Sequence, residues 1–215
     1  MIKVKSFVFN PFLENTYVLH DDSNECIIID PGCYERFEED QLVQYLYEHN
    51  LKPVRLLNTH CHIDHVFGNQ FVKTKYHLDL EIHQKDQETL RAVKAYAPSY
   101  GFQHFQEAEA DKFFDEGDVI TFGNSILNIM YVPGHAPGHV AFYNEDQKIC
   151  MGGDVLFRES IGRTDLPGGE FDTLIASIRD KMFKLHDDTV VYNGHGQTTT
   201  IGHEKVYNPF CAIGR

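Results

Sequence analysis

Residues 58–65 read Asn-Thr-His-Cys-His-Ile-Asp-His and gather three histidines and an aspartate in one short segment. In an extended chain, side chains two residues apart point to the same side. We therefore expect His60, His62 and Asp64 to converge, with His65 on the next turn. Imidazole and carboxylate are the ligands that a borderline metal such as zinc prefers. The spacing predicts a metal-binding loop and not merely a polar loop that is rich in histidine.

The composition is that of an ordinary globular protein. Of the 215 residues, 42% are hydrophobic and 24% are charged, so we expect one domain with a substantial core over residues 1–215. The formal net charge of −13 argues against nucleic acid as a partner. No apolar run reaches the roughly 18 residues of a membrane span, so no membrane partner is expected. The oligomeric state is left open by these features.

The cysteine pattern indicates the compartment. The five cysteines are scattered and form no Cys-x-x-Cys pair, which is typical of reduced thiols in a cytoplasmic protein. Cys61 lies between His60 and His62 and should point to the opposite side, so we expect it to pack rather than to bind a metal.

Hydrophobic periodicity predicts a chain of mixed strands and helices. Strands are expected at residues 4–9, 16–19, 26–29, 54–57, 80–83, 119–122, 126–132, 140–143, 148–151 and 189–192. Helices are expected at 37–49, 67–76, 84–96 and 171–185, with a last helical turn at 202–207. The metal loop follows the end of a buried strand, which is where α/β sheets place ligands. The aromatic segment 96–116 is either a lid over a substrate pocket or a helix tail packed on the core.

Three later segments present ligand-type side chains directly after predicted strands. His135 follows Pro133-Gly134, Asp154 follows two glycines, and His195 lies between two glycines. Proline and glycine form turns that can hold a side chain at the end of a strand.

Taken together, these segments resemble the metallo-β-lactamase superfamily, whose HxHxDH signature matches residues 60–65 and whose later motifs follow in order. The resemblance implies an α/β fold, the four-layer αββα sandwich, with the site at one edge of two sheets. It also implies two divalent metal ions, zinc by preference, with iron or manganese as alternatives. The ligands would be His60, His62 and His135 for one ion, Asp64, His65 and His195 for the other, and Asp154 between them. His139 occupies a position usually held by a small residue, and we expect it either to support a ligand residue or merely to pack.

Two further runs narrow the resemblance. Residues 160–169 (Ser-Ile-Gly-Arg-Thr-Asp-Leu-Pro-Gly-Gly) and 194–202 look like those of compact bacterial proteins similar to glyoxalase II, the hydroxyacylglutathione hydrolases. This implies a thioesterase that cleaves S-acyl-glutathione, or a similar small-molecule thioester, with a metal-bridging hydroxide. Asp64 and Asp154 would then serve catalysis as well as metal binding.

The resemblance also implies roles for residues outside the ligand set. Arg163 lies where related enzymes bind the glutathione carboxylate, although a surface salt bridge to Asp165 is the alternative. Thr59 and Asp165 are candidates for orienting the ligand imidazoles. We expect the site to lack the extra C-terminal helical segment of the full-length enzyme and the aromatic contact after His195. The sequence therefore supports hydrolysis as the reaction better than it supports glutathione as the group that the enzyme recognises.

Two alternatives remain open. Persulfide dioxygenases also share the Thr-His-Cys-His and Gly-Arg-Thr-Asp runs, and they would use a single iron held here by His60, His135 and Asp154. Imidazole and carboxylate accept zinc, iron and manganese alike, so the ligands do not decide between the two. The second alternative is a non-catalytic metal-binding protein, against which the intact ligand set argues.

Overall fold

The computed structural model describes residues 1–213, and the chain forms two compact units. The first unit comprises residues 1–114 and 121–126, and the second comprises residues 115–120 and the chain from 127 onward. The expectation of a single domain over residues 1–215 stays a prediction. Within the described residues, no helix combines the length and the apolar character that crossing a membrane requires.

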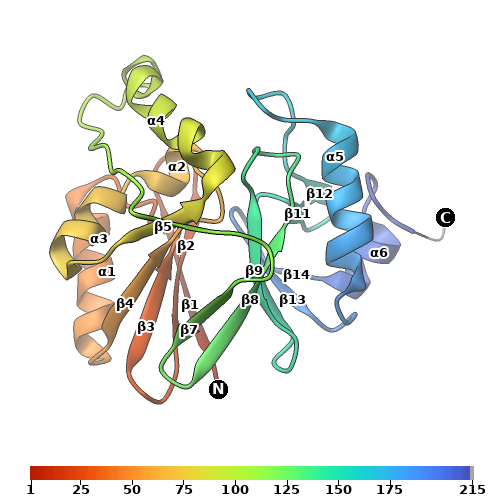
Figure 1. The fold of residues 1–215 in the computed structure, drawn as a ribbon, viewed down its shortest axis with the longest axis horizontal. Helices are drawn as coiled ribbons and strands as arrows, with labels where there is room; N and C mark the ends of the chain where they lie inside the picture. The colour runs from red at the N-terminus through yellow and green to blue at the C-terminus, as the bar shows by residue number, and fades with distance from the viewer. Residues whose placement is uncertain (214–215) are drawn as a thin grey trace. The chain divides into compact units, whose positions relative to one another are not determined.

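The first unit contains a six-stranded sheet with the order β1-β2-β3-β4-β5-β6 (Figure 1). Its first three strands form an antiparallel meander, and the next three run parallel to β3. The strands are β1 (Lys3–Phe9), β2 (Glu14–His20), β3 (Glu25–Ile29), β4 (Lys52–Leu57), β5 (Leu80–His83) and β6 (Lys112–Phe114).

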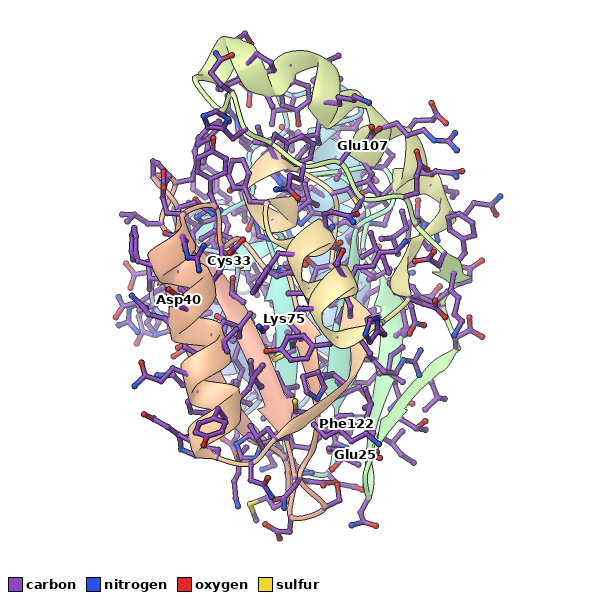
Figure 2. All side chains as sticks on the ribbon, turned by 90° about the vertical axis from the view of Figure 1, so that its left-hand side faces the viewer. Glu25, Cys33, Asp40, Lys75, Glu107 and Phe122 are labelled. Carbon is purple, nitrogen blue, oxygen red and sulfur yellow. The ribbon has the colours of Figure 1, made fainter. Side chains whose placement is uncertain are left out.

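Helices α1 (Arg36–Glu48) and α3 (Asn69–Tyr76) cover one face of this sheet. A capping box between Glu35 and Glu38 starts α1 by satisfying backbone N–H groups that the first turn leaves unpaired. Leu42 of α1 is buried in the core that the helices share with the strands. Figure 2 views this face, with Asp40 on α1 and Lys75 on α3 exposed on it.

The second sheet has the order β14-β13-β10-β9-β8-β7, and its strand residues outside 121–126 belong to the second unit. Its strands are β7 (Val119–Phe122), β8 (Ser125–Tyr131), β9 (Val140–Asn144), β10 (Ile149–Gly153), β13 (Val190–Asn193) and β14 (Thr199–Thr200). A short hairpin, β11 (Leu156–Phe157) with β12 (Ser160–Ile161), stands apart from this sheet. Leu174 of α5 (Phe171–Ala176) and Ile201 of α6 (Ile201–Tyr207) join its hydrophobic core.

The structure departs from the predicted elements where short pieces depend on tertiary pairing. Strand β6 lies inside segment 96–116, where the sequence predicted no strand. Its three residues form a strand by pairing with β5. The helix expected at 171–185 changes its hydrogen-bond pattern along its length. It is α-helical in α5, becomes a π-helical turn at Ser177–Lys181 and tightens to a 3₁₀ turn at Met182–Lys184.

Candidate metal centre

The metal loop leaves the end of β4 and is still extended at His62, and the short helix α2 (Ile63–Val66) begins immediately after it. The expectation that Asp64 continues the extended alternation is therefore wrong, because Asp64 and His65 lie on α2. The helical turn nevertheless brings the side chains together. The ring centroid of His60 lies 4.8 Å from that of His62 and 4.2 Å from that of His65. Asp64 Oδ2 lies 3.8 Å from His65 Nε2.

Asp30 connects these ligand candidates and was not singled out by the sequence analysis. It directly follows β3 and is buried, and its carboxylate accepts hydrogen bonds from the Thr59 backbone N–H (2.7 Å) and hydroxyl (2.6 Å). His65 Nδ1 lies 3.1 Å from Asp30 Oδ2. The parallel register pairs Ile29 with Leu57, so Asp30 and the start of the metal loop occupy the same sheet edge. An aspartate directly after the strand beside β4 was the signal that could have identified it.

The hydrogen bonds fix which ring nitrogen can bind a metal. An ionised carboxylate only accepts, so His65 Nδ1 donates to Asp30 and the lone pair of the neutral ring remains on Nε2. The Thr59 hydroxyl gives its proton to Asp30 and so accepts from His60 Nδ1, at 3.1 Å. His60 is therefore assigned the same tautomer by its hydrogen-bond network.

In the second unit, the imidazoles of His135 and His195 converge on the carboxylate of Asp154. Asp154 Oδ2 lies 3.6 Å from His135 Nε2 and 3.3 Å from His195 Nε2. Strands β10 and β13 are parallel, with Gly153 paired to Asn193, so both strands end at the same sheet edge. This pairing explains why Asp154 and His195, 41 residues apart in the sequence, lie together.

Hydrogen bonds that involve backbone groups hold His135 and Asp154 in place. His135 Nδ1 donates to the Arg163 carbonyl over 2.8 Å, which leaves Nε2 with the lone pair. His139 is buried, and its Nε2 accepts a hydrogen bond from the Asp154 backbone N–H at 3.0 Å. A side chain at Gly162 would clash with the Asp154 carbonyl, so the chain can pass this closely only at a glycine.

Arg163 and Asp165 form the salt bridge that the sequence left as the alternative to substrate binding. Arg163 Nε and Nη2 donate to the two Asp165 carboxylate oxygens at 2.7 and 2.6 Å, and the side chains are 60% and 67% exposed. The hydrogen bonds from Arg163 lower the pKa of Asp165 to about 2. The group that orients His135 is thus the Arg163 carbonyl, while the roles expected for the Arg163 and Asp165 side chains stay predictions.

Cys61 is fully buried, and burial raises the pKa of its thiol well above the ordinary value. The expectation that Cys61 packs rather than binds a metal stays a prediction. The other four cysteines are also buried free thiols.

Within segment 96–116, Phe102 packs against other aromatic side chains of the first unit. Its ring centroid lies 4.5 Å from that of Phe67, 5.0 Å from that of Tyr34 and 5.6 Å from that of Phe12. Tyr100, in contrast, is 59% exposed. Phe102 therefore follows the core-packing alternative, and a lid function for the exposed part stays a prediction.

Comparison with known proteins decides the family. The profile of the metallo-β-lactamase superfamily matches residues 9–195, a range that includes every ligand candidate. The chain belongs to this superfamily. The α/β sandwich fold predicted from the sequence is thereby confirmed.

Individual members of the superfamily match along nearly the full chain. Hydroxyacylglutathione hydrolase GloC of Haemophilus influenzae is 38% identical over 203 residues, which cover 93% of each protein. Among solved structures, the B3 metallo-β-lactamase BLEG-1 is 34% identical, with a TM-score of 0.88 over 99% of this chain and 100% of that one. TTHA1623 in a di-iron-bound form is 32% identical, with a TM-score of 0.86 over 96% and 100%.

Proposed function

We propose that this protein is a metal-dependent hydrolase that cleaves S-acyl-glutathione or a similar small-molecule thioester. The observation that carries the proposal is the orientation of the imidazoles. In both units the ring Nδ1 atoms are engaged by protein acceptors, Asp30 for His65 and the Arg163 carbonyl for His135. The similarity to GloC supports the thioester as substrate.

The donor set fits a pair of divalent ions in its chemistry. Buried imidazoles with Nε2 lone pairs and a buried carboxylate are the groups that zinc and iron accept. We assign the ligands as the sequence predicted them: His60, His62 and His135 for one ion, Asp64, His65 and His195 for the other, with Asp154 shared. The similarity to a protein described in a di-iron-bound form supports iron beside zinc as a candidate metal.

When bound, paired divalent ions supply Lewis acidity and lower the pKa of coordinated water from 15.7 to about 7, so that hydroxide is present at neutral pH. The chain's own residues prepare this chemistry. Asp30 and the Arg163 carbonyl hold the imidazoles in the tautomer that carries its lone pair on Nε2, and the His139 ring fixes the backbone at Asp154. These groups set the geometry in advance, so little reorganisation is needed during the reaction.

Cleavage of a thioester does not require a dedicated general acid. The departing thiol has an ordinary pKa of about 8.5, so it leaves readily as a thiolate. An amide leaving group needs a proton, which makes a β-lactam the more demanding substrate. The likeness to BLEG-1 nevertheless makes β-lactam hydrolysis the second candidate to test.

The direct experiment measures turnover of three substrates by zinc-loaded and by iron-loaded protein: S-lactoylglutathione, a thioester without glutathione, and a chromogenic β-lactam. We expect thioester hydrolysis to exceed β-lactam hydrolysis, and we expect chelation to abolish it. Asp154→Ala should lose both turnover and bound metal. Absence of thioester turnover in the loaded protein contradicts the proposal, and oxygen uptake with glutathione persulfide by a one-iron form would favour the dioxygenase.

Arg163→Ala tests glutathione as the recognised group. If the arginine leaves Asp165 to bind the substrate carboxylate, the variant should raise KM for S-lactoylglutathione and leave KM for the thioester without glutathione unchanged. Equal effects on both substrates, or no effect, would remove the carboxylate-binding role from Arg163 and leave the salt bridge as its function.

A further inference from the structure

Asp86 lies against the metal loop from outside the ligand set. It follows β5 in a 3₁₀ turn and immediately precedes helix α4 (Gln87–Tyr96). Its side chain is buried, with the residue only 1% exposed, and its Oδ2 accepts a hydrogen bond from the Cys61 backbone N–H at 2.6 Å. That N–H belongs to the residue between His60 and His62.

Further donors hold the Asp86 carboxylate in one position. The Thr89 hydroxyl, one turn along α4, donates to Oδ1 at 3.2 Å. The Cys61 thiol also donates to this carboxylate, so Cys61 is held through both its backbone and its side chain. A buried carboxylate is costly unless it is hydrogen-bonded, and these contacts make this orientation the favourable one.

The other end of α4 lies beside the backbone of Ile63 in the loop. Tyr96, the last residue of α4, is half-buried, and its hydroxyl interacts with the Ile63 backbone. Burial and the nearby Asp64 carboxylate raise the pKa of Tyr96, which keeps the phenol neutral. The two neighbours of His62 are therefore both held from α4. Cys61 contacts Asp86 at the start of this helix, and Ile63 contacts Tyr96 at its end.

We propose that Asp86 is a positioning residue of the metal centre, which fixes the Cys61 peptide and thereby the angle between the His60 and His62 imidazoles. The inference rests on the metal site of the proposed function, but it concerns metal affinity and not the substrate. The physical basis is preorganisation. His60 and His62 flank Cys61, and they can bind the same ion only if the backbone at Cys61 keeps its orientation.

The test is a chelator-competition measurement of zinc affinity, made without substrate. Asp86→Ala removes the acceptor, and we expect affinity to fall about 10- to 100-fold, the usual range for residues that orient ligands. Asp86→Asn keeps an acceptor oxygen and should restore most of the affinity. Glu88→Ala removes an exposed carboxylate from the same helix and serves as the matched control, with affinity unchanged.

Thermal unfolding with and without zinc separates positioning from general stabilisation. A purely structural residue would lower both midpoints equally, whereas a positioning residue reduces the rise that zinc produces. Asp86→Leu, similar in size and without an acceptor, replaces the alanine variant if that variant does not fold. Wild-type zinc affinity in Asp86→Ala or Asp86→Leu, or an unchanged zinc-induced rise of their thermal midpoint, overturns the inference while leaving the hydrolase proposal intact. Wild-type protein that binds zinc but hydrolyses no thioester would contradict the hydrolase proposal and leave the positioning role of Asp86 intact.

Discussion

At the scale of single residues, the candidate centre depends on acceptors that hold the imidazole rings. Asp30 receives hydrogen bonds from Thr59 and His65 in a buried environment. Leaving a buried donor without an acceptor costs about 1–3 kcal/mol of folding free energy. The ring of His65 therefore keeps its orientation only while the Asp30 carboxylate is present.

Asp30→Ala is therefore expected to lower the free energy of unfolding by about 2–4 kcal/mol and to weaken metal binding about 10- to 100-fold. Chemical denaturation and chelator competition measure the two effects. Asp22→Ala removes an aspartate that is exposed and paired with Lys3, so it is the control and should change neither quantity appreciably. Normal metal affinity in Asp30→Ala would show that His65 needs no orienting partner.

Gly134 shows how closely the His135 turn packs. Its φ of +127° lies in the region that favours glycine, and an added Cβ would collide with the backbone of Leu174 in α5. Gly134→Ala should cost about 2–4 kcal/mol of stability through strain and overpacking. Gly117 has a similar positive φ of +92° but open space around it, so Gly117→Ala should cost only about 1–2 kcal/mol. Equal losses in urea denaturation would contradict the packing argument.

Residue type and spacing predicted the ligand candidates within residues 60–65, and the resemblance to the superfamily added His135, Asp154 and His195. The sequence did not identify Asp30 or Asp86. Their roles depend on which strands pair and on where α4 begins, and many aspartates that follow a strand only cap a turn or face solvent. The Arg163 carbonyl could not be identified either, because any residue offers the same backbone oxygen.

At the scale of elements, the longer strands and helices were predictable from periodicity, and the shortest pieces were not. Helix α2 has only four residues and leaves no periodic pattern, yet it decides that Asp64 and His65 project from a helical turn. The β7–β8 hairpin tip shows a related dependence on tertiary contacts. Asp21 accepts hydrogen bonds from the Asn124 backbone N–H and the Ser125 hydroxyl, both at 2.7 Å, and so holds the tip within the first unit.

The hydrogen bonds to Asp21 predict that the stability of the protein depends on pH. Burial alone would raise the pKa of Asp21, but hydrogen bonds from Ser23, Ser125 and Asn124 outweigh it and hold the pKa well below the ordinary value. A carboxyl with a depressed folded-state pKa stabilises the protein above the unfolded-state pKa of about 3.9 and loses that contribution as pH falls. Asp21→Asn should be about 1–3 kcal/mol less stable than wild type at pH 7, with the difference narrowing below about pH 4. Urea denaturation at several pH values that showed a constant difference would refute this assignment.

At the scale of the whole molecule, the family fold followed from the order of the motifs along the chain, and the match over residues 9–195 confirmed it. Metal binding at the proposed centre would add stability, because ligands that bind the folded state better than the unfolded state shift the equilibrium toward folding. Free zinc at about 1,000 times its Kd would add about 4 kcal/mol to the free energy of unfolding. Chelation should therefore lower the thermal midpoint reversibly, and scanning calorimetry before and after zinc is restored would measure it. A midpoint unaffected by chelation would mean that metal contributes nothing to the folded state.

The central claim is the proposed ligand set, in which seven side chains hold two metal ions. Anomalous diffraction from crystals of the metal-loaded protein, collected at the metal absorption edge, tests it most directly. The account predicts two peaks about 3.5–4 Å apart, with Asp154 between them and His60 and His195 on different ions. A single peak, or a pair of peaks without Asp154 and His195 among the ligands, would contradict it.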